Sequence, residues 1–142
     1  MHCRASRLTA VPLTLIVPIA LFLLVSLSGV FAFAAGGGIT GTYTNLHFNS
    51  EGGDLLGVEL RIAVTRSGYQ GVLQIAEGEP GQLVLVNVQV DGNRINFVIP
   101  NDNPDAGSFS GAIANGVLTG HFRFKSGGAE DVVLKKGKSY WD

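Results

Sequence analysis

Two consecutive β-hairpin patterns between Leu83 and Phe124 constrain the fold of this chain more than any other feature. Apolar residues alternate with others along both arms of the first hairpin, so the apolar side chains point to one face. The first turn is Asp91-Gly92-Asn93-Arg94, in which glycine tolerates the positive φ that tight hairpin turns require. The expected facing pairs are Val90 with Ile95, Val88 with Phe97, and Val86 with Ile99.

The second hairpin turns at Asn115-Gly116, the residue pair preferred in type I′ turns. Both turns give a register that keeps the apolar residues on one face, whereas a slip of one residue would expose them. Gly111 lies opposite Gly120 and leaves a gap on that face. The gap could accommodate a bend or a facing aromatic ring, or it could leave room for a ligand. The expected facing pairs are Ile113 with Leu118, Gly111 with Gly120, and Phe109 with Phe122.

The remaining segments continue the β pattern, with strands expected at 39–44, 56–66, 69–76 and 130–135 and a loop at 45–54. Val58, Leu60, Ile62 and Val64 are expected to point inward. A turn at Ser67-Gly68 would place Gly71 opposite Val64, Leu73 opposite Ile62, and Ile75 opposite Leu60. Eight short strands joined mostly by tight turns predict an all-β, antiparallel up-and-down meander. Such a meander closes into a barrel when its last strand reaches its first, and a two-layer β-sandwich is the alternative.

The first 34 residues have the pattern of a secretory signal peptide, whose apolar part is expected to be helical. Arg4 and Arg7 precede an apolar run from 11 to 25, and Ala32-Phe33-Ala34 offers small residues for cleavage after Ala34. An uncleaved membrane anchor is the alternative, because the apolar stretch could span a bilayer. Cleavage would leave one domain at 35–142. Contact with a membrane is expected only through the signal segment.

The composition of residues 35–142 limits the cellular locations and the classes of partner that suit this protein. This part contains no cysteine, so an exported protein would fold without disulfides, as suits a bacterial envelope protein. It keeps eight of the ten Lys and Arg and all eleven Asp and Glu, which gives a net charge of −3. A mildly acidic domain gives no indication of nucleic-acid binding. We therefore expect a periplasmic or secreted protein.

The hairpin region resembles a small β-domain of exported bacterial proteins, often fused in front of secreted α/β-hydrolases. The resemblance rests on the pattern at 83–100, on Leu118-Thr119-Gly120-x-Phe122 and on the closing Val133-Leu134-Lys135. It implies a β-domain and an envelope location. The catalytic residues of such proteins belong to the hydrolase domain, and this chain has no Gly-x-Ser-x-Gly elbow. The opening Gly41-Thr42-Tyr43 also resembles lipocalin- and avidin-like barrels.

No catalytic or metal-binding constellation is evident in residues 35–142. His47 falls in the expected first loop, and His121 falls on the outward phase of a strand, without the spacing of zinc ligands. The segment 101–107 alternates oxygen-bearing side chains but departs from the EF-hand pattern, which favours a polar turn in which Asn and Asp bond their own backbone. We therefore expect no enzyme activity, no metal and no cofactor.

The sequence leaves two kinds of binding function open. The first is an accessory module whose barrel holds a small apolar ligand or an envelope component, since a barrel of this size is either filled or holds one small molecule. The candidate ligand residues are Tyr43, Phe97, Phe109, Gly111, Gly120 and Phe122. The second is a protein–protein interaction module, a partner or inhibitor of a secreted hydrolase. Its candidate contact residues are Phe48, Tyr140 and Trp141.

Overall fold

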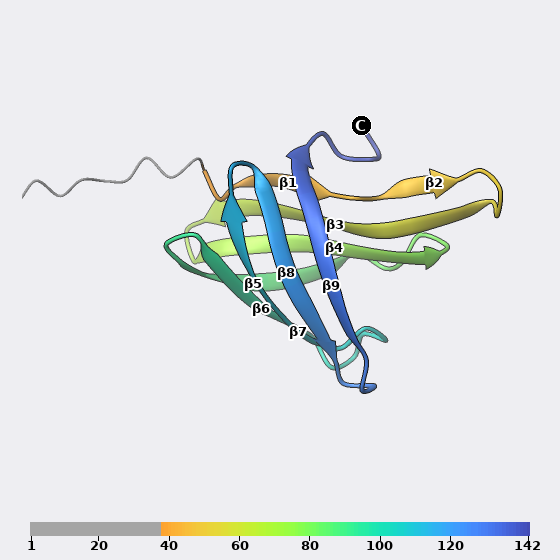
Figure 1. Ribbon diagram of the computed structural model, residues 1–142. Helices are drawn as coiled ribbons and strands as arrows, with labels where there is room; N and C mark the ends of the chain where they lie inside the picture. Colours follow the sequence, from red (N-terminus) through yellow and green to blue (C-terminus); the bar gives the residue numbers. More distant parts are fainter. Residues whose placement is uncertain (1–37) are drawn as a thin grey trace, which may run out of the picture. The chain divides into compact units, whose positions relative to one another are not determined.

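The computed structural model describes residues 38–142, which are all-β and contain no helix. The proposed signal segment lies outside the described residues. The chain forms a closed, eight-stranded antiparallel barrel in meander order, as the sequence predicts (Figure 1). The strands are β1 (Gly41–Thr44), β2 (His47–Asn49), β3 (Asp54–Thr65), β4 (Gly68–Gly78), β5 (Val84–Asp91), β6 (Arg94–Ile99), β7 (Gly107–Ala114), β8 (Val117–Phe124) and β9 (Ala129–Gly137).

Strand β1 closes the barrel by pairing with β3 on one side and with β9 on the other. Strand β2 continues β1 along the same edge of β3 and occupies part of the segment that the sequence assigned to a loop. That prediction was wrong, because Leu46 of this segment is buried with Leu55 and Ala76 in a small second apolar cluster. The two short strands together make the first strand of the barrel.

Asn45 joins β1 to β2 without breaking contact with β3. Its backbone N–H donates to the Val58 carbonyl at 3.0 Å, and its side-chain Oδ1 accepts from the Val58 N–H at 2.7 Å. The neighbouring Gly57 has a φ of +110°, and a Cβ there would overlap the Asn45 side chain and backbone. The side chain of Asn45 therefore replaces a ladder hydrogen bond at the point where the strand is interrupted.

Two junctions between strands of the barrel wall are formed by short ladders. The β5–β6 ladder and the β1–β9 ladder each contain three residue pairs, whereas β7–β8 contains eight. Figure 1 shows the steep strands β8 and β9 crossing in front of the nearly horizontal β3 and β4. The expected pairs Val88 with Phe97 and Val86 with Ile99 are absent from the β5–β6 ladder, which ends at Gln89 opposite Asn96. The barrel thus combines closure with the layering of a sandwich.

The turns explain which predicted registers are right. Asn115 and Gly116 have φ of 51° and 76°, as a type I′ turn requires, and all three pairs predicted across β7 and β8 are present. The β3–β4 turn lies one residue earlier than expected, and Gly68 has a φ of 111° at the start of β4. This moves the register by two residues, so that Leu73 faces Leu60 rather than Ile62. A shift of two preserves the inward face.

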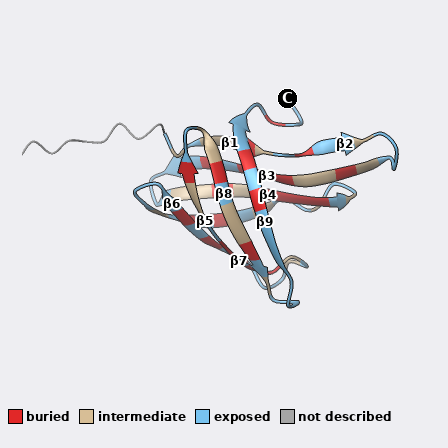
Figure 2. Cartoon of the chain, in the orientation of Figure 1, coloured by how far each residue is buried: buried red, intermediate tan, exposed pale blue. Residues whose placement is uncertain are grey.

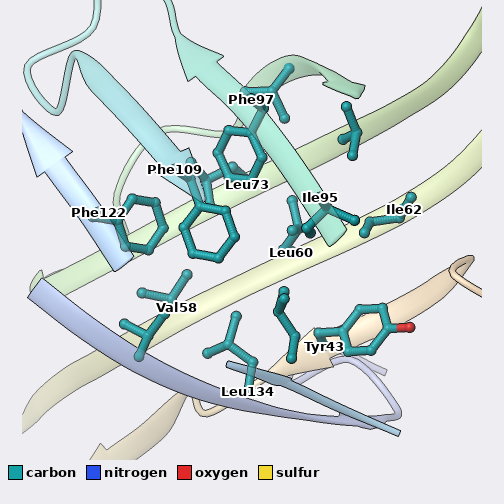
Figure 3. Packing of buried hydrophobic residues seen from close by; sticks show 14 of the residues in the cluster. Tyr43, Val58, Leu60, Ile62, Leu73, Ile95, Phe97, Phe109, Phe122 and Leu134 are labelled. Carbon is teal, nitrogen blue, oxygen red and sulfur yellow. The ribbon is translucent and has the colours of Figure 1, made fainter. Parts of the chain in front are cut away.

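The core lies between the two layers and alternates with exposed residues along the strands (Figure 2). Phe97, Phe109 and Phe122 come from one layer, and Figure 3 shows them close to Val58 and Leu73 of the other. Val64 is an exception to the predicted inward face, because it lies near the end of β3 and is 66% exposed.

Candidate functional site

The candidate ligand residues inside the barrel pack against one another. The rings of Phe97 and Phe109 stack with centroids 4.8 Å apart, and the Phe109 and Phe122 centroids are 4.7 Å apart. All three side chains are almost completely buried. Aromatic pairs at this separation stabilise a core beyond the area that they bury. These rings therefore occupy the middle of the barrel (Figure 3).

The gap at the facing glycines is filled by an aromatic ring. A Cβ on Gly120 would overlap Cζ and Cε2 of Phe109, and a Cβ on Gly111 would come within 2.9 Å of the same ring. Of the interpretations that the sequence left open for this gap, the structure shows the facing aromatic side chain. The space beside Gly111 and Gly120 is thus part of the packed core.

Tyr43 is also buried, but its hydroxyl has a structural partner. The hydroxyl donates to the Ile39 carbonyl at 3.0 Å, and burial raises the pKa of Tyr43 above its usual value. The ammonium group of Lys136 lies 5.6 Å from the ring centroid, within range of a cation–π contact. Figure 3 shows Tyr43 separated from the three phenylalanine rings.

The most elaborate polar cluster lies outside the barrel, where the C-terminal segment 138–142 covers β3. The Glu59 carboxylate is only 3% exposed, although its strand position points outward. It accepts from the Ser139 hydroxyl at 2.7 Å, from the Tyr140 N–H at 2.9 Å and from Arg61 Nε at 3.0 Å. Arg61 also donates to the Ser139 hydroxyl. These contacts hold the C-terminal segment on the barrel wall.

Hydrogen bonding and charge dominate the ionisation of Glu59. Burial raises the pKa of the Glu59 carboxyl, but hydrogen bonds from Tyr140, Ser139 and Arg61, together with the Arg61 charge, outweigh it. The pKa therefore lies below its ordinary value of 4.5. Glu59 is an anion at neutral pH, and all of its described partners are donors.

Trp141 is fixed in position but remains half exposed. Its indole N–H donates to Gln74 Oε1 at 2.8 Å, and the Gln74 amide in turn donates to the Gly81 carbonyl at 3.0 Å. The Tyr140 ring packs edge-on against it at 5.0 Å. Trp141 is 51% exposed and lines a hollow of about 340 Å³ with Val72 and Leu83.

Trp141 belongs to a continuous apolar surface, here called the apolar face. Leu85 lies directly opposite Val72 across β4 and β5, and it shares a second hollow with Val98 of β6. Leu83, Leu85 and Val98 are 69%, 72% and 65% exposed. The apolar face consists of Val72, Leu83, Leu85, Val98 and Trp141. Phe48, the third candidate contact residue, is 57% exposed on β2, and no described contact joins it to this face.

Ser110, His121 and Asp131 lie opposite one another on three neighbouring strands. His121 Nδ1 donates to Asp131 Oδ1 at 2.6 Å. Among the described residues, however, no hydrogen bond joins Ser110 to the imidazole. The Asp131 side chain is 89% exposed, whereas the acid of a catalytic triad is buried and orients the histidine. This row therefore lacks the geometry of an activated serine.

The other histidine and the polar loop have local structural roles. His47 Nδ1 donates to the Asn45 carbonyl at 3.0 Å. In the 101–107 loop, Asn103 Oδ1 accepts from the Asp105 N–H at 2.8 Å, which is the backbone-bonding turn that the sequence indicated. Within residues 38–142, no three His, Cys, Asp or Glu side chains are grouped as a metal site requires. The same residues form no helix that could cross a bilayer.

Comparison with protein-family models, curated proteins and solved structures finds no match to this chain.

Sequence reasoning missed the residues that hold Trp141 in place. It treated Glu59 and Arg61 as ordinary outward-facing residues, although Glu59 is covered by a segment 80 residues later in the chain. The apolar face left a clearer signal, because Leu83 and Leu85 extend the apolar run of β5 onto the outward phase. Large apolar residues on the solvent face of a half-buried strand indicate a contact surface.

Proposed function

We propose that this protein is an exported, non-catalytic binding module, and that a partner protein docks on its apolar face. The observation that supports this most strongly is the half-exposed Trp141, held by Gln74 at the edge of an apolar hollow. Tryptophan and arginine are enriched at the energetic centres of protein interfaces. Arg61 lines the same hollow.

The fixed position of the Trp141 side chain favours this function. Binding normally costs conformational entropy for each side chain that becomes ordered. The indole is already ordered by its hydrogen bond and by Tyr140, so less entropy remains to be lost on docking. The packed interior also favours a surface role over a ligand inside the barrel, since Phe109 fills the space beside the paired glycines.

The proposed location is the periplasm or the exterior of a bacterial cell, because of the signal-peptide pattern in the first 34 residues. The partner is then an envelope or secreted protein. The resemblance to β-domains fused to secreted hydrolases makes such a hydrolase the first partner class to examine.

A photo-crosslinking amino acid placed at Leu83 tests this proposal in the living cell. We expect crosslinking to a specific protein, and we expect Leu83→Glu to weaken binding of that purified partner at least about tenfold. Thr119, exposed on β8, is the matched control for both the crosslinker and the glutamate substitution. Equal crosslinking at the two positions, or binding unaffected by Leu83→Glu, would contradict a role for the apolar face.

A further inference from the structure

The opening between β5 and β6 has the features of a strand-binding site. The two strands pair only over Gln89–Asp91 of β5 and Arg94–Asn96 of β6, next to their turn. Beyond that point, residues 84–88 pair with β4 and residues 97–99 pair with β7. Among the described strands, these two segments have no ladder partner on the sides that face each other. The two strands of the closed barrel therefore separate along this line, here called the seam, beyond their three ladder pairs.

The backbone of β5 directs hydrogen-bonding groups into the seam. Asp91 and Arg94 are the first and last residues of the turn, so the backbone of Asp91 faces β6. In an antiparallel ladder, the residues that face a given neighbour alternate along the strand. Asn87 and Leu85 therefore direct their N–H and C=O groups to the same side as Asp91. On β6, Pro100 follows at the seam and has no N–H to offer.

The seam has an apolar floor and an uncharged rim. Its hollow has a volume of about 390 Å³ and reaches the buried residues Val86, Phe97 and Phe109. None of its lining residues is charged, and five of them carry an amide or a hydroxyl. These five are Asn87, Gln89, Asn96, Ser108 and Ser110. A charged group buried here would meet no opposite charge in the lining, which makes its desolvation costly.

We propose that the seam binds an uncharged, extended peptide segment, which adds to β5 as a strand at Leu85–Asn87. Backbone groups at a sheet edge are best satisfied by another backbone, and alternate side chains of the added strand would contact Leu85 and Val98. This inference rests on the proposed function, because the segment belongs to the partner that docks on the apolar face. Leu85 and Val98 are common to both surfaces.

A short peptide of alternating valine and threonine, labelled with fluorescein and carried on a polyethylene glycol tail, is a suitable probe. Fluorescence anisotropy with the full protein should show saturable binding. Two altered peptides test the chemistry: one with N-methyl groups on the valines, which removes N–H donors along one edge, and one with a central glutamate. Each is expected to bind at least about tenfold more weakly, since the first loses backbone hydrogen bonds and the second buries a charge.

Substitutions at Asn87 test whether the backbone of β5 forms hydrogen bonds with the peptide. Asn87→Pro removes the N–H that faces the seam, while Asn87→Ala removes only the side chain. We expect loss of peptide binding with proline and retention with alanine. Leu85→Lys is a second test that does not depend on proline being tolerated, because this side chain is 72% exposed, and it should also weaken binding.

The outcomes distinguish the seam from the apolar face. Equal binding of the N-methylated and unmodified peptides would overturn strand addition and would indicate apolar contact alone. No binding of the unmodified peptide would also overturn it. If the crosslinked partner depends on Leu83 but binds Asn87→Pro normally, the seam inference fails and the proposed function stands. If it depends on neither residue, the proposed function fails.

Discussion

The ring of Phe109 occupies the space in which any larger residue at Gly120 would place its Cβ. The two residues lie on adjacent strands, and Gly120 is itself opposite Gly111. The ring therefore lies flat over a stretch of sheet that lacks side chains. This arrangement lets three phenylalanine rings share one layer of the core without separating the two sides of the barrel.

Gly120→Ala should destabilise the protein by about 1–3 kcal/mol, because the Phe109 ring must move out of a packed site. Urea unfolding followed by circular dichroism measures this difference. Gly137→Ala is the control, since a Cβ there meets no atom within 4 Å, and it should be close to neutral. Similar losses of stability in both variants would show that the Phe109 ring is not the reason why alanine destabilises the protein at Gly120.

Acidification should release the C-terminal segment. Because the pKa of Glu59 is lower in the folded protein than its ordinary value of 4.5, its stabilising effect is complete above that value. The effect is lost as the pH falls below 4.5 and through the folded-state pKa. The chain has one tryptophan, so the fluorescence of Trp141 reports undocking directly.

Glu59→Gln should remove most of this acid transition and cost about 1–3 kcal/mol at neutral pH, since hydrogen bonds to a buried charge are lost. Glu77→Gln changes an exposed carboxyl on β4 and serves as the control. An unchanged fluorescence titration in Glu59→Gln would assign the transition to another group.

Asn45→Ala should loosen β2 from β3. It leaves the Val58 N–H without its 2.7 Å acceptor, which costs about 1–3 kcal/mol. Hydrogen exchange should show faster exchange at Val58 and Leu56 than in the wild type. The control is Asn101→Ala, which alters an asparagine on an exposed loop and should leave exchange in β3 unchanged. Uniformly faster exchange across the barrel in Asn45→Ala would contradict a local role for Asn45.

The row of Ser110, His121 and Asp131 should not react as a catalytic triad. We expect a fluorophosphonate probe to label the wild type and Ser110→Ala equally. Asp131→Asn should change stability by less than about 1 kcal/mol, because exposed ion pairs contribute little. Labelling that disappears in Ser110→Ala would revise the expectation of a non-catalytic protein.

The fold was largely predictable because its signals are local. The Asn115-Gly116 turn fixes the β7–β8 register through its backbone conformation, and the alternation of apolar residues fixes the inward face. The β3–β4 register was misjudged by two residues, since alternation alone cannot distinguish shifts by an even number. The end of the β5–β6 ladder was not visible either, because the separation of two strands depends on how the layers pack.

The candidate site was predictable only in part. Trp141 was named from the sequence as a candidate contact residue, and the structure shows that its side chain is half exposed. Gln74, which accepts from the indole, and Glu59, which holds the neighbouring Ser139, were not identified, because these contacts join residues 67 and 80 positions apart in the chain. Contacts between distant segments leave no periodic pattern, and no local rule connects an outward glutamate to a tail that covers it.

Strand β1 has a consequence for the order of folding. Its partners in β9 lie far along the chain, Thr42 being opposite Gly137, whereas most other ladders join strands that are neighbours in sequence. Closing so long a loop is entropically costly, so local hairpins are expected to form first. During synthesis from the N-terminus, β1 can pair with β3 early, but its other edge must wait for β9, the last strand, before the barrel closes.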